Sequence, residues 1–151
     1  KLPFVELVQE IERTAGMAVN EIFSLGGQST YRRFETAALK STIEQFDEVV
    51  IAVGGSLVSE PESFELLLSS CYTIWVKASA QEHMDRVVAQ GDHRPMADHR
   101  NAMDDLKRIL TERSTLYGRA DRILDTSGQT PVNSLRALAQ IYATAPTAPA
   151  P

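Results

Sequence analysis

The stretch Gly54-Gly55-Ser56 is the first place where residue types point to chemistry. It follows the apolar run "EVVIAV" at 48–53 and precedes Pro61. Two adjacent glycines at the end of a buried strand leave the main chain bare, so a ligand can approach the backbone closely. The other interpretation is a tight turn between a strand and a helix, and the pattern does not separate the two. Gly54, Gly55 and Ser56 are therefore candidate ligand-binding residues.

The side chains most often used for metal binding or nucleophilic chemistry do not form a pattern here. His83, His93 and His99 lack the spacing with cysteines or carboxylates on one helix face that a zinc site needs. Cys71 is the single cysteine, which excludes an internal disulfide and is typical of a reducing cytoplasm. The sequence predicts no metal site and no catalytic residue.

Composition indicates one soluble domain. The 151 residues are 43% hydrophobic and 23% charged, with a formal net charge of −5 that disfavours nucleic-acid binding by the chain's own field. No apolar run reaches the roughly 18–20 residues needed to cross a membrane. We expect a domain at 1–143, a disordered Pro/Ala tail at 144–151, and a cytoplasmic protein. The chain opens with Lys1 rather than Met, which leaves room for an upstream segment.

Strand and helix patterns alternate along the chain. Four apolar strands are predicted at 2–7, 48–53, 72–78 and 121–126, and helices at 9–16, 18–26, 28–46, 61–70, 80–90, 100–120 and 134–143. This alternation predicts an α/β fold, a three-layer open parallel sheet with helices on both faces. The strand at 48–53 is continuously apolar, as expected for burial on both faces. Ligands of such sheets bind beyond the carboxyl ends of the strands, where Gly54 lies.

Six segments together carry a family resemblance. In chain order they are "FVELVQEIE", "EIFSLGGQSTYRRFE", "IAVGGSLV", "YTIWVKA", "HRPM" and "LTERSTLYGRAD". Over residues 2–127 their order and spacing resemble those of shikimate kinase. The resemblance implies a P-loop fold of the nucleoside-monophosphate-kinase kind, with a mobile lid near 91–99.

The same resemblance assigns roles to three arginines. Arg32 in "TYRRFE" and Arg113 in "TERSTLY" match the family's arginines that hold the acceptor's carboxylate, and Arg94 in "DHRPM" matches the lid arginine that reaches phosphate. A guanidinium is a planar fork of donors suited to either anion. A single such arginine is more often a solvated side chain, but three in matching motifs favour a site for a small anionic ligand.

Departures from the family pattern surround these arginines. Glu6 and Val8 stand where the family has two aspartates, one on the magnesium side and one at the acceptor hydroxyls. Valine cannot orient or deprotonate a hydroxyl, and Ser56 replaces the third glycine of the family's triplet. The phosphate-binding motif GxxxxGK[ST] is absent from the 151 residues, so the fold is expected here without its first strand and P-loop. ATP and Mg²⁺ are implied only if a P-loop precedes residue 1.

Three functions are compatible with the sequence. The favoured hypothesis is the effector domain of a bacterial transcriptional regulator of benzoate degradation, which senses benzoyl-CoA or a similar aromatic acyl-CoA and contacts DNA only through an upstream helix-turn-helix domain. The alternative is a diverged shikimate kinase that transfers the ATP γ-phosphate to shikimate or a related hydroxy acid. A third is a module with no ligand, in which the three arginines are dispensable. A homodimer is left open, and no membrane partner is expected.

Overall fold

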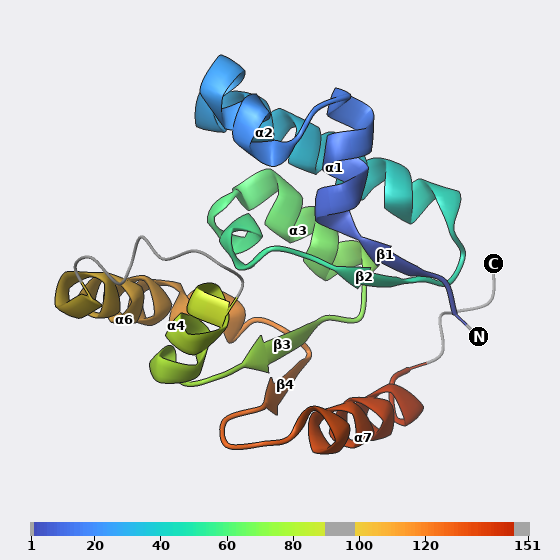
Figure 1. The fold of residues 1–151 in the computed structure, drawn as a ribbon. Coiled ribbons are helices and arrows are strands. Elements are labelled where there is room, and N and C mark those ends of the chain that lie inside the picture. The colour runs from blue at the N-terminus through green and yellow to red at the C-terminus, as the bar shows by residue number, and fades with distance from the viewer. Residues whose placement is uncertain (1, 90–98, 147–151) are drawn as a thin grey trace. The chain divides into compact units, whose positions relative to one another are not determined.

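The structure is a computed structural model that describes residues 2–89 and 99–146 (Figure 1). The chain divides into two compact units, an N-terminal unit of residues 1–71 and a C-terminal unit of residues 72–151. Among the described residues, no helix combines the length and the apolar character needed to cross a bilayer.

The N-terminal unit joins two short strands to three helices. Its elements are β1 (Phe4–Glu6), α1 (Leu7–Ala15), α2 (Val19–Gln45), β2 (Val50–Ala52), the 3₁₀ helix η1 (Gly55–Ser59) and α3 (Pro61–Ser70). β1 and β2 pair in parallel, with Phe4 opposite Val50 and Glu6 opposite Ala52. The carboxyl ends of both strands therefore lie at the same edge of the pair. Glu6 and the segment after Ala52 start from that edge.

Helix α1 begins earlier than the sequence pattern predicts. A strand was expected at 2–7 and a helix from residue 9, whereas α1 starts at Leu7 and includes Val8. Leu7 and Ile11 are four residues apart and therefore lie on one helix face, which packs against α2 and is fully buried (Figure 1). Burial of this face explains the early start. At the other end, Gly16 has φ +69° and donates its N–H to Glu12 O at 2.8 Å, the left-handed C-cap that favours glycine.

Helix α2 consists of two helical segments joined at a kink, which agrees with the two helices that the sequence predicts. The sequence predicts separate helices at 18–26 and 28–46, and the structure runs from Val19 to Gln45 with a break in helical geometry at Gly27. Gly27 has φ +68° and ψ −172°, a conformation that is essentially restricted to glycine. Gly27 thus separates the two helical segments of α2. The buried residues Ile22 and Leu39 lie on either side of the bend.

Strand β2 is shorter and more exposed than predicted. The apolar run 48–53 was expected to be buried on both faces, but the strand spans only Val50–Ala52, and the side chains of Val50 and Val53 are 42% and 36% exposed. Burial on both faces requires neighbouring strands and a cover of helices on each side. Within the described residues β2 pairs with β1 alone. The number of partner strands of β2 cannot be predicted from its apolar run alone.

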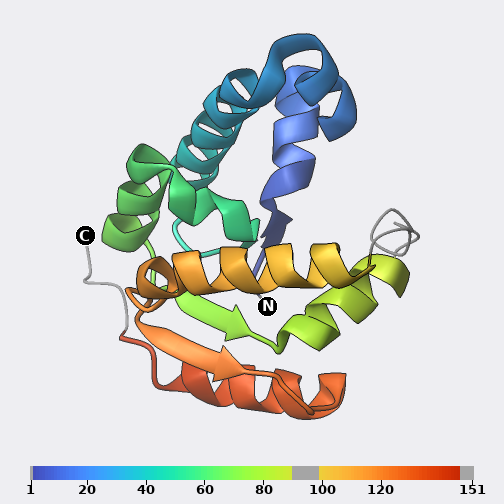
Figure 2. The same ribbon diagram turned by 90° about the vertical axis from the view of Figure 1, so that its left-hand side faces the viewer.

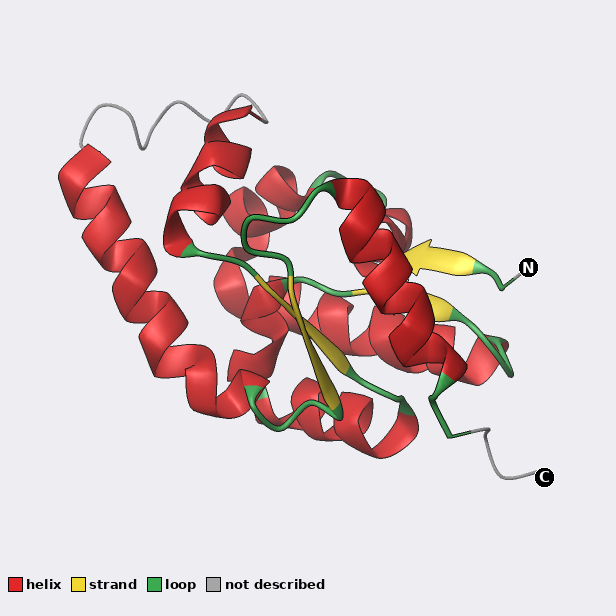
Figure 3. Cartoon of the chain, turned by 90° about the horizontal axis from the view of Figure 1, so that it is seen from below, coloured by secondary structure: helices red, strands yellow, loops and turns green. Residues whose placement is uncertain are grey.

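The C-terminal unit has the three-layer arrangement. Its elements are β3 (Ile74–Lys77), α4 (Ala80–Ala89), α6 (His99–Tyr117), β4 (Arg122–Asp125) and α7 (Pro131–Ala143). β3 and β4 are parallel, with Ile74 opposite Arg122 and Lys77 opposite Asp125. The strand pair lies between α6 and α7 (Figure 2), and Figure 3 shows the two strands crossing between helices. The core of this unit consists of Ala78, Met84, Met103 and Leu124.

Polar contacts fix the ends of these elements. Ser79 caps α4 as predicted: Glu82 N donates to Ser79 Oγ at 3.3 Å, and Ser79 Oγ donates to the Glu82 carboxylate at 2.7 Å. The Asp121 carboxylate accepts bonds from Thr73 N (2.7 Å) and Thr73 Oγ1 (2.8 Å). The backbone hydrogen bond from Thr73 is the main reason that the pKa of Asp121 is lowered. These bonds join the start of β3 to the start of β4.

The predicted single sheet is instead two two-stranded parallel pairs, β1–β2 and β3–β4. Each pair is packed by helices of its own unit, and no described strand pairs with both β2 and β3. Parallel strands connected by helices confirm the predicted α/β class.

Candidate anion-binding site

Arg32 is the central residue of the site and lies in the middle of α2. Arg32 and Glu35 are three residues apart, which places them on the same helix face. Arg32 Nη1 donates to Glu35 Oε2 at 2.6 Å. The Arg32 and Glu35 side chains are only 12% and 1% exposed, so this is a buried ion pair. Such a pair holds the guanidinium in one orientation, because an unpaired buried charge is costly.

Glu60, at the N-cap position of α3, brings a second carboxylate to the same guanidinium. Its Oε1 lies 3.4 Å from Arg32 Nε. Thr36 Oγ1 and Ser63 Oγ are hydrogen-bonded at 2.7 Å and join α2 to the first turn of α3. This bond keeps Glu60, the residue before α3, beside Arg32. The Nε–H of Arg32 is buried and finds no acceptor with hydrogen-bond geometry in the described chain.

A hollow of about 490 Å³ opens beside these residues. It is lined by Gln28, Ser29, Arg32 and Glu60. Its wall therefore carries one guanidinium, one carboxylate, an amide and a hydroxyl. An arginine with an unused donor in a polar hollow is suited to a carboxylate or a phosphate.

Aromatic rings support the guanidinium from its own helix. The Tyr31 ring stacks on Phe23 with centroids 4.7 Å apart, and the Arg32 guanidinium carbon lies 5.4 Å from the centroid of Tyr31. Burial raises the pKa of Tyr31, and the charge of Glu35 raises it further. Tyr31 therefore remains neutral at physiological pH. Its ring limits the directions in which Arg32 can move.

Most of the other predicted site residues of the N-terminal unit lie at the carboxyl edge of its strand pair. Glu6 ends β1, is exposed, and accepts a hydrogen bond from Gln9 Nε2. Val8 lies in the first turn of α1 and is 45% exposed. Gly54 immediately precedes η1, and Gly55 and Ser56 form its first turn. The parallel register thus brings these segments to one edge.

Gly54 bears on the choice between a binding loop and a tight turn. Its φ of −70° and ψ of 143° are accessible to any residue. A Cβ added at Gly54 would meet no atom within 4 Å. The described chain therefore gives no steric or conformational reason for glycine at this position.

Two of the predicted arginines lie outside the N-terminal unit. Arg113 is on α6, is half-buried, and makes no hydrogen bond or ion pair within the described chain. Arg94 and the lid predicted at 91–99 lie outside the described residues, except for His99 at the start of α6.

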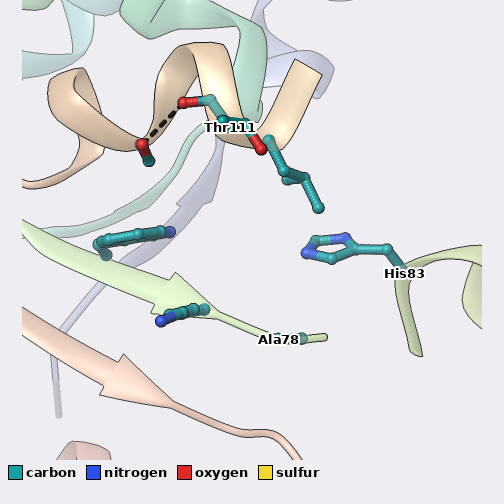
Figure 4. A pocket seen from close by; sticks show the side chains of 7 residues that line it. Ala78, His83 and Thr111 are labelled. Atoms are coloured by element: carbon teal, nitrogen blue, oxygen red, sulfur yellow. Dashed lines mark hydrogen bonds between the residues drawn. The ribbon is translucent and has the colours of Figure 1, made fainter. Parts of the chain in front are cut away.

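A second cavity, of about 260 Å³, lies within the C-terminal unit (Figure 4). Ala78 follows β3, His83 extends from α4 and Thr111 from α6, and the remaining lining residues are Trp75, Lys77, Leu110 and Ser114. Burial lowers the pKa of His83, which favours its neutral form. Of the predicted site residues that the structure describes, none lines this cavity.

The sequence pattern missed Glu35 and Glu60. The i, i+3 spacing of Arg32 and Glu35 could have indicated their pairing. Glu60 precedes Pro61 and has no local signal, since its contact with Arg32 spans 28 residues. No group of three or more His, Cys, Asp or Glu side chains that could hold a metal ion occurs in the part of the chain that the structure describes.

Known proteins match this chain in sequence and in fold. The family model described as shikimate kinase matches residues 1–143. The shikimate kinase of Thermodesulfovibrio yellowstonii is 34% identical over 128 residues, which is 85% of this chain and 73% of that protein. The shikimate kinase of Synechococcus sp. (strain CC9605) is 33% identical over 128 residues. The match covers 85% of this chain but only 63% of the Synechococcus protein, less than two thirds of its length.

Solved structures of the same name share the fold. A shikimate kinase from Acinetobacter baumannii, solved in complex with shikimate, superposes with a TM-score of 0.79 at 22% identity and covers 97% of this chain and 82% of that one. The shikimate kinase from Bacteroides thetaiotaomicron also gives 0.79 at 22% identity, over 94% of this chain and 83% of that one. The fold is thus that of the P-loop kinases, as predicted. Together with the sequence matches, this means that the chain belongs to the shikimate kinase family.

The favoured hypothesis from the sequence was wrong. The matching family model and the relatives above are shikimate kinases, which contradicts a benzoyl-CoA-sensing domain of a DNA-binding regulator of benzoate degradation. That hypothesis gave great weight to Val8 and Ser56. Relatives that are 33–34% identical differ from this chain at about two thirds of the aligned positions, so two substitutions do not define a new function.

Proposed function

We propose that this chain forms the acceptor-binding part of a shikimate kinase and binds shikimate through its carboxylate. The observation that carries the proposal is the Arg32 guanidinium. It is nearly buried, fixed by Glu35 at 2.6 Å, and has an Nε–H that no described residue accepts, beside a polar hollow. The family match supports shikimate as the acceptor. The complete reaction would transfer a phosphoryl group from ATP to a shikimate hydroxyl.

Arg113, in the C-terminal unit, is the second arginine that the family resemblance proposes for an anionic ligand. Arg113 is half-buried and has no partner in the described chain, so it is available to an anion. Gly54 would let the ligand lie against bare backbone, since nothing in the described chain requires a glycine there. Val8 provides neither a base nor a hydrogen-bond acceptor, so it takes no part in orienting the reacting hydroxyl.

ATP and Mg²⁺ are the cofactors of shikimate kinases, and the residues of this chain do not fit them. The sequence contains no GxxxxGK[ST] motif, which supplies the amide cradle and the lysine for nucleotide phosphates. The described residues contain no cluster of three acidic, His or Cys side chains for a metal ion. We therefore assign to these 151 residues the binding of the acceptor and no step of phosphoryl transfer.

A calorimetric titration of the chain with shikimate tests the proposal. Arg113→Ala should weaken binding by about 10- to 100-fold, the usual cost of losing a hydrogen bond to a charged group. The stability of this variant should be nearly unchanged, because Arg113 makes no bond in the described chain.

Arg108→Ala is the matched control, on the same helix with a side chain that is 62% exposed. It should bind shikimate like the unaltered chain. Absence of shikimate binding by the unaltered chain would contradict the proposed function, and equal affinity of the Arg113 and Arg108 variants would show that Arg113 does not contact the ligand.

A further inference from the structure

Glu60 stands out because it occupies the N-cap position of α3 while its carboxylate faces Arg32. It is the residue before α3, where side chains usually cap the helix, yet it makes no capping hydrogen bond. Glutamate is also not among the residues preferred at that position. Its side chain is instead 3.4 Å from Arg32 Nε. The contact is an ion pair without a hydrogen bond, since the Nε–H has no acceptor of suitable geometry among the residues that the structure describes.

The two carboxylates at Arg32 are held differently. Glu35 is 1% exposed and bonds at 2.6 Å, whereas Glu60 is 36% exposed, lies at 3.4 Å and lines the hollow. Glu35 is therefore a fixed support of the guanidinium. Glu60 is the partner that can leave, because a half-exposed carboxylate regains water when it swings outward.

The charges around Arg32 determine which ligands compete with Glu60. One guanidinium faces two carboxylates, so the cluster has a net charge of −1 before any ligand arrives. A ligand carboxylate at the Nε side would meet Glu60 at close range, and like charges repel most strongly where water is partly excluded. A neutral ligand would meet no such repulsion.

From this arrangement we infer that Glu60 is a specificity-determining residue that competes with the ligand's carboxylate for Arg32 Nε. This inference rests on the proposed function, since it takes the acceptor to be an anion. Binding of a carboxylic acid displaces Glu60 from the guanidinium. Glu60 thereby lowers the affinity for anionic acceptors and leaves that for neutral ones unchanged.

The test compares two ligands that differ in one charge, shikimate and its methyl ester. Glu60→Gln keeps the size and the polarity of the side chain and removes the charge. It should bind shikimate about three to ten times more tightly than the unaltered chain, the effect expected for removing one partly exposed like charge. The affinity for the ester should stay the same. Glu60→Asp keeps the charge and should restore part of the unaltered affinity.

Glu62→Gln is the matched control, because Glu62 is an exposed glutamate in the first turn of the same helix. It should bind both ligands like the unaltered chain. Raising the salt concentration should reduce the difference in shikimate affinity between Glu60→Gln and the unaltered chain, because salt screens partly exposed charges.

The outcomes separate the two proposals. If the unaltered chain binds shikimate and Glu60→Gln binds it equally or more weakly, Glu60 does not compete and the inference is overturned while the site stands. A gain for the ester as large as that for shikimate also overturns it, since the effect would not depend on charge. If neither the unaltered chain nor any variant binds shikimate, the proposed function itself fails, and the inference fails with it.

Discussion

Replacement of Gly54 by alanine should separate ligand binding from stability. The backbone at Gly54 has φ −70° and ψ 143°, and the new methyl group meets no atom of the described chain within 4 Å. Alanine at a compatible glycine position restricts the unfolded chain and typically adds about 0.4–1 kcal/mol to the free energy of unfolding. The variant should therefore be as stable as the unaltered chain or slightly more so.

The effect on binding should have the opposite sign. If shikimate lies against the bare backbone at Gly54, a methyl group overpacks the contact. Overpacking costs about 1–3 kcal/mol, which weakens binding by roughly 5- to 150-fold. Urea unfolding followed by circular dichroism gives the stability, and calorimetric titration with shikimate gives the affinity.

Gly27→Ala provides the contrast within the same unit. It too has no atom within 4 Å of an added Cβ, but its φ of +68° is unfavourable for alanine and should cost about 1–3 kcal/mol of stability. Loss of stability in the Gly54 variant would mean that the glycine serves a tight turn. Unchanged shikimate affinity in that variant would refute a close approach of the ligand.

Two further predictions concern the polar contacts that hold each unit together. Glu35→Gln should lower the free energy of unfolding by about 3–5 kcal/mol, because it leaves the Arg32 guanidinium buried beside a neutral amide; a urea midpoint equal to that of the unaltered chain would show that the pair is not needed. The pKa of Asp121 is lowered in the folded chain, chiefly by the backbone hydrogen bond from Thr73. The carboxylate therefore contributes its full stabilisation above its ordinary pKa of 3.8, and this contribution is lost as the pH falls through the lower pKa of the folded chain. Asp121→Asn should therefore be less stable than the unaltered chain at pH 6 and lose less stability on acidification, and parallel pH profiles for the two proteins would contradict this role.

Local signals in the sequence predicted local structure well. Gly16 as a helix C-cap, Pro61 at the first position of a helix and Ser79 as an N-cap are all confirmed. Each depends on the chemistry of one residue and its immediate neighbours. The two glycines at 26–27 were predicted to end a helix, and the break in helical geometry at Gly27 confirms this.

What the sequence could not reveal depends on contacts between distant segments. The exposure of β2 follows from its having one partner strand among the described residues, which its apolar run does not encode. The Arg32–Glu60 contact joins α2 to the residue before α3, and only folding brings them together. The family resemblance identified Arg32, whereas its two ion-pair partners, Glu35 and Glu60, were found only in the structure.

The most direct test of the central claim follows the side-chain Nε–H resonance of Arg32 by NMR during a titration with shikimate. Arg33 is the internal control, since it is the next residue on α2 and is exposed. The account predicts that the Arg32 resonance shifts saturably, because its free Nε–H gains an acceptor, while the Arg33 resonance stays in place. An Arg32 resonance that does not move while the chain binds shikimate would contradict the account, because the ligand would then be held elsewhere.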